Sequence, residues 1–114
     1  MREFPSKTAM LLALAFYIPI TLAAESAITI SSPKDGDKFK STATIKIAYK
    51  ATFGEKGNHL RLYVDDQPEI LLNKLKGTYT LGPLAPGKHG ICIRIYDKEH
   101  ADTGIQDCAM FRVE

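Results

Sequence analysis

Apolar and polar residues alternate along much of the chain, which is the pattern of β-strands with one buried face. The clearest case is the segment 90–96, where isoleucine stands at every second position, and the segment 109–113 repeats the alternation. A polar loop separates these two segments. We therefore predict an antiparallel hairpin centred near His100.

This centre fixes the register of the hairpin. Residues whose numbers add up to 200 lie opposite each other: Cys92 with Cys108, Arg94 with Gln106, and Tyr96 with Gly104. The chain has only these two cysteines, and a non-hydrogen-bonded pair of facing residues suits a disulfide. The bond would close a loop of about 17 residues and contribute about 3 kcal/mol. Metal ligation is the alternative, but two thiols without a second pair lack the spacing of a zinc site.

Shorter segments with β-branched or alternating residues precede this hairpin, and Gly, Pro, Asn and Asp separate them. The expected strands are 27–31, 43–50, 59–65, 69–72 and 78–81. With the hairpin, they predict an all-β fold, an immunoglobulin-like antiparallel β-sandwich of about seven strands. The chain has no tryptophan, so the Cys, Trp and Cys pattern of antibody domains is absent.

The start of the chain resembles a secretory signal peptide. Arg2 and Lys7 precede the apolar run 9–18, and small residues follow at 21–24. A membrane anchor is the alternative, but Pro19 directly follows the run, and the run is shorter than the roughly 20 residues that span a bilayer. We expect cleavage after Ala23 or Ala24, which releases one domain, residues 25–114, into the periplasm or the exterior with no membrane attachment.

Charge and motif content exclude several functions. The 15 Lys and Arg residues and the 13 Asp and Glu residues are interspersed along the chain, so no cluster indicates a nucleic-acid partner. No GxSxG sequence and no Gly-rich phosphate loop is present. We therefore expect a noncatalytic protein.

Three short motifs carry a resemblance to a group of proteins. They are HLRLYVD, with His59 and Asp65; LAPGKH, from Leu84 to His89; and DKEH, with Asp97 and His100. With the start SSPKDGDKF, they resemble small exported bacterial domains of unknown function that carry HxHxxxD and, later, LxPGxH and DxxH. The resemblance implies fold and location, whereas Arg61 replaces the second histidine of the first motif.

A metal site is one hypothesis for these histidines. The loops before residue 59 and after residue 96 lie at the same end of an immunoglobulin-like sandwich, so His59 should approach His100 and Asp97. Such a set, with Glu55, Glu99 or Asp102 as further oxygen donors, would suit copper or zinc. Arg61 counts against it, and we favour a structural interpretation in which Asp97 caps its own loop.

His89 should lie about 26 Å from Asp97 along an extended strand, too far to share an ion. We expect His89 to be partly buried and hydrogen-bonded, and Met110 to be a surface packing residue.

The outward face of the strands at 59–65, 90–96 and 109–113 combines residues that are enriched at protein interfaces. They are Arg61, Tyr63, Arg94, Tyr96 and Arg112. Aromatic faces with polar rims also suit sugars, and simple cross-strand packing is a further interpretation. Our leading hypothesis is an exported noncatalytic immunoglobulin-like module that binds a protein or glycan in the cell envelope. The alternative is a periplasmic copper or zinc binding protein that uses His59 and His100.

Overall fold

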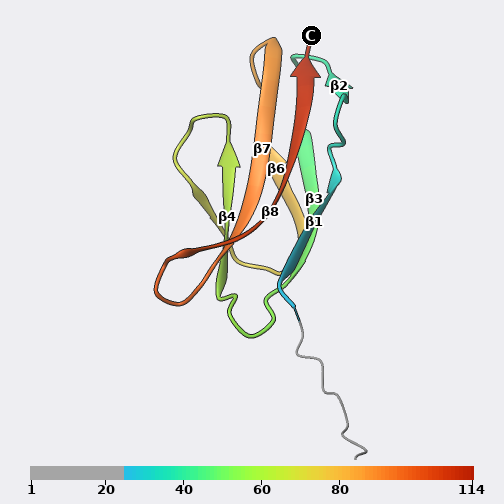
Figure 1. Cartoon of the computed structure of the whole chain (residues 1–114). Coiled ribbons are helices and arrows are strands. Elements are labelled where there is room, and N and C mark those ends of the chain that lie inside the picture. The colour runs from blue at the N-terminus through green and yellow to red at the C-terminus, as the bar shows by residue number, and fades with distance from the viewer. Residues whose placement is uncertain (1–24) are drawn as a thin grey trace, which may run out of the picture.

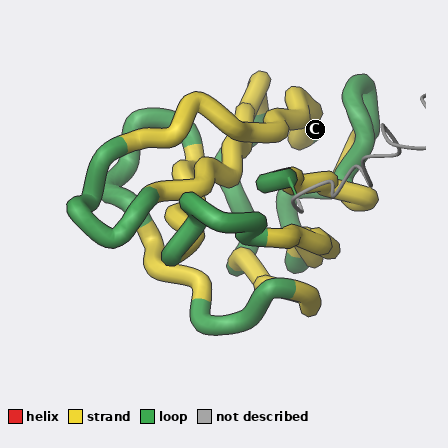
Figure 2. The backbone as a smooth tube through the Cα atoms, turned by 60° about the horizontal axis from the view of Figure 1, so that its bottom comes forward, coloured by secondary structure: helices red, strands yellow, loops and turns green. Residues whose placement is uncertain are grey.

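A computed structural model describes residues 25–114. In this part of the chain all regular structure is β-strand (Figures 1 and 2), and no helix could cross a membrane. The predicted signal peptide, residues 1–24, lies outside the described residues.

Two packed sheets form the fold. The strands are β1 (Ala27–Ser32), β2 (Lys38–Phe39), β3 (Ile45–Thr52), β4 (His59–Val64), β5 (Ile70–Leu72), β6 (Lys76–Leu81), β7 (Gly87–Tyr96) and β8 (Asp102–Val113). One sheet has the order β1-β3-β6 and the other the order β2-β8-β7-β4-β5. All pairs are antiparallel except β2 with β8. The predicted immunoglobulin-like sandwich is therefore confirmed, with one strand more than expected, because the two residues of β2 are too few to show an alternation.

The core lies between the sheets and contains the inward positions of the alternating segments. The apolar residues of these alternations that are buried are Ile45, Ile47, Tyr49, Leu60, Leu62, Val64, Ile91, Ile93, Ile95, Ala109, Phe111 and Val113. Burial of a large aliphatic side chain contributes roughly 1.5 to 3 kcal/mol. The predicted strand 43–50 begins later, at Ile45, and its first inward residue, Ala43, is only half-buried.

The β7–β8 hairpin has the predicted register over most of its length. Cys92 and Cys108 form a disulfide with Cα atoms 4.1 Å apart, the short separation of a non-hydrogen-bonded pair. The register shifts beyond Arg94, so that Tyr96 faces Asp102 and not Gly104. The predicted Tyr96–Gly104 pair is therefore wrong. The cause is a tight turn, closed by a hydrogen bond from Asp97 N to Ala101 O, which places the end of the hairpin before the expected centre.

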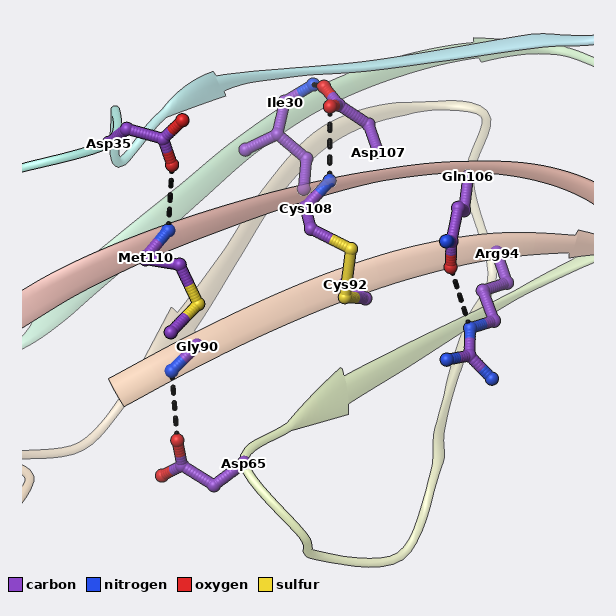
Figure 3. The surroundings of a disulfide bond; sticks show 10 residues. All are labelled: Ile30, Asp35, Asp65, Gly90, Cys92, Arg94, Gln106, Asp107, Cys108 and Met110. Carbon is purple, nitrogen blue, oxygen red and sulfur yellow. Dashed lines mark hydrogen bonds between the residues drawn. A yellow bond between two sulfur atoms is a disulfide. The ribbon is translucent and has the colours of Figure 1, made fainter. Parts of the chain in front are cut away.

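Hydrogen bonds cover the outer edge of β8 next to the disulfide (Figure 3). Asp107 Oδ2 accepts a hydrogen bond from Ile30 N of β1 at 2.8 Å, and Asp35 Oδ1 accepts one from Met110 N at 2.9 Å. These contacts occupy an edge that would otherwise be open to another strand. The inner face of this sheet packs on the core that it shares with the other sheet, so the outward face of β4, β7 and β8 is its uncovered side.

Candidate functional site

Two arginines and two tyrosines form a compact group on the outward face of the five-stranded sheet, which we call the arginine–tyrosine cluster: Arg61, Tyr63, Arg94 and Tyr96. Arg61 and Arg94 lie directly opposite each other on β4 and β7. Their inward neighbours are core residues, so the pleat of the strands directs these four side chains away from the core.

Each guanidinium in the cluster lies over a tyrosine ring. Arg61 Cζ is 4.0 Å from the centroid of the Tyr96 ring, and Arg94 Cζ is 4.8 Å from that of Tyr63. The two tyrosine hydroxyl groups share a hydrogen bond of 2.7 Å. Arg94 Nε also donates to Gln106 Oε1 of β8 at 2.9 Å (Figure 3). Cation–π contacts and hydrogen bonds therefore hold both positive charges in defined positions.

Tyr96 is only 7% exposed although it lies on the outward face. The His59 ring stacks on it at 5.6 Å between centroids, and the Arg61 guanidinium lies over it as well. Tyr63 is less covered, and burial together with the hydrogen bond that its hydroxyl group shares with Tyr96 raises the pKa of Tyr63. Tyr96 is thus buried beneath His59 and Arg61, whereas Arg61, Tyr63 and Arg94 are partly exposed.

Arg112 is not part of this cluster. It lies opposite Lys88 of β7 and Lys38 of β2, at the other end of the same face. The alternation along β8 correctly predicts that the Arg112 side chain points outward. However, Arg112 is six residues from Gln106, or roughly 20 Å along a strand. The predicted five-residue binding face therefore divides into the cluster and a separate basic end.

The structure brings His59 and His100 together beside the cluster. Their ring centroids are 5.1 Å apart, and Arg61 Nη2 donates to His100 Nδ1 at 3.1 Å. His59 begins β4 directly after the β3–β4 loop, and His100 lies in the β7–β8 loop. Figure 1 shows that these two loops lie at the same end of the sandwich. Burial, followed by the charge of Arg61, lowers the pKa of His59. Both imidazoles thus extend the cluster toward the loops.

The geometry at these histidines gives the metal hypothesis no support. Asp97 Oδ1 accepts hydrogen bonds from Glu99 N and Ala101 N, each at 2.9 Å, so its carboxylate caps the loop. The Arg61 guanidinium occupies the lone pair of His100 Nδ1 and would repel a cation. Within residues 25–114, no three His, Cys, Asp or Glu side chains are grouped to hold a metal ion.

His89 has the structural role that its position predicts. Its Nε2 donates to Ala85 O at 2.6 Å, and its Nδ1 contacts Asp65 Oδ2 at 2.7 Å. Asp65 also accepts a hydrogen bond from Gly90 N through Oδ1 (Figure 3). Because both ring nitrogens face acceptors, the contacts with Asp65 and Ala85 raise the pKa of His89. The pair joins the end of β4 to the start of β7, and neither nitrogen is free to act as a base.

We expect the substitution His89→Gln to remove a pH-dependent part of the stability. The raised pKa means that the folded state binds the proton more tightly, so this contribution is complete below about pH 6.5 and is lost as pH rises through the folded-state pKa. At pH 6 the variant should lose about 1 to 2 kcal/mol in the free energy of unfolding. Urea unfolding of both proteins from pH 5.5 to 9 measures the difference.

The difference between the two proteins should shrink as pH rises above 6.5. A difference that stays constant over this range would contradict a charged His89. Lys88→Gln, an exposed substitution on the adjacent residue, serves as the control and should leave the pH profile unchanged.

The Asp65–His89 pair and the Gln106 and Asn58 contacts were missed in the sequence. Asp65 ends one strand and His89 begins the antiparallel neighbour, so the topology of the sandwich was the signal that could have placed them together. Gln106 was assigned opposite Arg94, but a facing pair alone does not reveal a hydrogen bond. Asn58 Oδ1 lies 3.0 Å from His59 Nδ1, and nothing in the sequence indicates this contact.

Comparisons with known proteins agree on the fold. No protein-family model matches the sequence, and no curated protein matches it. The structure is similar to the fibronectin(III)-like modules of Clostridium thermocellum CbhA, with 18% identity, a TM-score of 0.58, and coverage of 76% of this chain and 96% of that chain.

It is also similar to part of the extracellular domain of a putative one-component system from B. thetaiotaomicron. The identity is 13% and the TM-score 0.58, over 90% of this chain and 16% of that chain. The chain therefore spans about a sixth of that protein. At these identities the comparisons show the fold alone, an immunoglobulin-like, fibronectin(III)-like sandwich. The function has to be argued from the residues of the candidate site.

Proposed function

We propose that the protein is an exported, noncatalytic immunoglobulin-like module that binds an acidic surface of a protein partner through the arginine–tyrosine cluster. One observation carries the proposal: Arg61 and Arg94 face each other across β4 and β7 without a carboxylate between them. Facing like charges destabilise a sheet. The ion pairs within residues 25–114 are Lys38–Glu114 and His89–Asp65, so both guanidinium groups remain available to a partner.

The cluster suits a protein better than a glycan. Sugars pack on open aromatic faces, but here a guanidinium lies over each tyrosine ring, and His59 stacks on Tyr96. A partner therefore meets oriented guanidinium groups. These match the two oxygens of a carboxylate, and arginine and tyrosine are enriched among the residues that dominate interface energies.

Leu71 adds an apolar contact beside these charges. It lies opposite Arg61 on β5 and is 60% exposed. Leu71, Arg61, Arg94 and Gln106 thus form one continuous row across four strands. A row with an apolar end and two cations suits a protein segment that combines acidic and apolar side chains.

Export is supported by the disulfide and by the start of the sequence. Disulfides persist in oxidising compartments such as the periplasm and the cell exterior, and Cys92 is joined to Cys108. A noncatalytic role is supported by the engagement of His89 and Asp97 in hydrogen bonds that shape the fold.

Selection from a random peptide library tests the proposal. We expect peptides selected on the purified protein to be enriched in Asp and Glu, and to bind the variant Arg61→Gln/Arg94→Gln at least tenfold more weakly. Tyr96 is not substituted because it is buried. A loss of folding on its replacement would be indistinguishable from a loss of binding. Affinity should also fall as salt rises, since exposed charges are screened.

The charge-matched control is Lys46→Gln/Lys50→Gln, which removes two exposed cations from the outer sheet face of β3. It should retain the affinity of the unmodified protein. Selected peptides without an acidic bias, or equal binding by the arginine variant, would refute the proposal.

A further inference from the structure

A second basic site lies at the opposite end of the same sheet face. Lys38, Arg112 and Lys88 lie directly opposite one another on β2, β8 and β7, so their side chains share the outward face. All three are exposed. This row is separated from Arg94 by six residues of β7, or roughly 20 Å, and is therefore distinct from the arginine–tyrosine cluster.

The row borders a hollow with an apolar floor. The hollow has a volume of about 500 Å³ and is lined by Gly36, Lys38, Lys88, Met110, Phe111 and Arg112. Met110 is 56% exposed and its side chain lies across Gly90, where an added Cβ atom would come within 2.7 Å of the sulfur. The missing side chain at Gly90 thus makes room for the methionine that forms the floor.

The backbone around the hollow is fixed. Asp35 Oδ1 accepts a hydrogen bond from Met110 N at 2.9 Å, and Met110 O accepts one from Gly36 N at 2.9 Å. Arg112 N donates to Asp37 O at 2.9 Å. Met110 and the cations therefore lie on paired strands, and hydrogen bonds join the neighbouring turn at residues 35–37 to β8. A preformed site requires such a fixed backbone.

The charges of the hollow are largely uncompensated. Among residues 25–114 the only ion pair of this row joins Lys38 to Glu114 at 3.8 Å, and both side chains are more than half exposed. The nearby carboxylates of Asp35 and Asp65 accept hydrogen bonds from backbone or His89. Among the described residues, Arg112 and Lys88 therefore have no ion-pair partner.

We propose that this hollow binds a single-chain anionic amphiphile, with its carboxylate between Arg112 and Lys88 and its alkyl chain on Met110. The combination of cations and a polarisable apolar floor carries the inference. An inorganic anion would leave Met110 unused, and a neutral alkyl compound would leave the cations unpaired. The volume lies within the range of about 300 to 1,000 Å³ of small-molecule sites.

Titration with decanoate, below its micelle-forming concentration, tests the site by NMR. Decanoate should shift the amide signals of residues 36–38, 88 and 110–112 in a saturable way. Its Kd should be at least tenfold lower than that of inorganic phosphate or of the neutral amphiphile decyl maltoside. Equal affinity for either of these probes, or shifts centred elsewhere, would overturn the proposal.

Two variants separate the contributions of charge and floor. Lys88→Gln/Arg112→Gln should weaken decanoate binding at least tenfold, whereas Lys46→Gln/Lys50→Gln on the other sheet should leave it unchanged. Met110→Gln should weaken decanoate but not phosphate. If vesicles of anionic lipid bind at these residues and dissolved decanoate does not, the site docks to membranes and the proposal fails.

Discussion

Replacing Ile93 by alanine is expected to lower the free energy of unfolding by about 2 to 5 kcal/mol. Ile93 lies in the central strand β7 opposite Leu62 of β4, and both side chains are 0% exposed. The truncated side chain would leave a cavity, because neighbouring strands fixed by ladder hydrogen bonds cannot collapse into the space. Urea unfolding followed by far-UV circular dichroism measures the loss.

Leu71→Ala is the control for this experiment. Leu71 is 60% exposed, so its truncation should change the free energy of unfolding by less than about 0.5 kcal/mol. A loss below about 1 kcal/mol for Ile93→Ala would contradict a close-packed core centred on β7.

The core was predictable because side-chain direction alternates strictly along a strand. Each isoleucine of 91–95 falls on the buried face once the strand is recognised, and no knowledge of its partner is needed. The same rule gives the direction of Arg61, Tyr63 and Arg94. Local periodicity thus specified both the buried face and the outward face of the strands that carry the candidate site.

The location of residues along the strands was predicted less well than the face on which they lie. A single hairpin centre predicted the pairs up to Arg94 and failed at Tyr96, since the turn at 97–101 depends on side-chain capping by Asp97. Arg112 was grouped with the cluster by its face alone, although its separation of six residues from Gln106 along one strand already implies roughly 20 Å. The first error arose where local hydrogen bonds of one turn set the register, and the second arose because the face of a residue was considered without its distance along the strand.

The environment of Tyr96 shows why the arrangement of the site could not be predicted from the sequence. Its alternation predicts an exposed residue, and its direction is indeed outward. However, Arg61 and His59 from the neighbouring strand cover its ring, and this coverage depends on the rotamers of long side chains. The free charges of Arg61 and Arg94, which carry the proposed function, likewise depend on where every carboxylate of the fold lies.

Removal of the disulfide, by the double substitution Cys92→Ala/Cys108→Ala, is expected to lower the free energy of unfolding by about 3 kcal/mol. The sequence separation is 16 residues, so the bond restricts a sizeable loop of the unfolded chain. A reductant should destabilise the unmodified protein by a similar amount and leave the variant unaffected. Equal stability of the oxidised and reduced protein would contradict the prediction.

The denaturant dependence should reveal where this stabilisation acts. β7 and β8 remain paired on both sides of Cys92 and Cys108 through a long ladder, so the native strands do not need the bond to stay in register. Its loss should mainly expand the unfolded chain, which raises the slope of the free energy of unfolding against urea. Unchanged amide shifts at Arg61 and Arg94, together with a steeper slope, are therefore the expected result. An unchanged urea slope together with altered amide chemical shifts at Arg61 and Arg94 would instead show that the disulfide maintains the native structure of the outward sheet face.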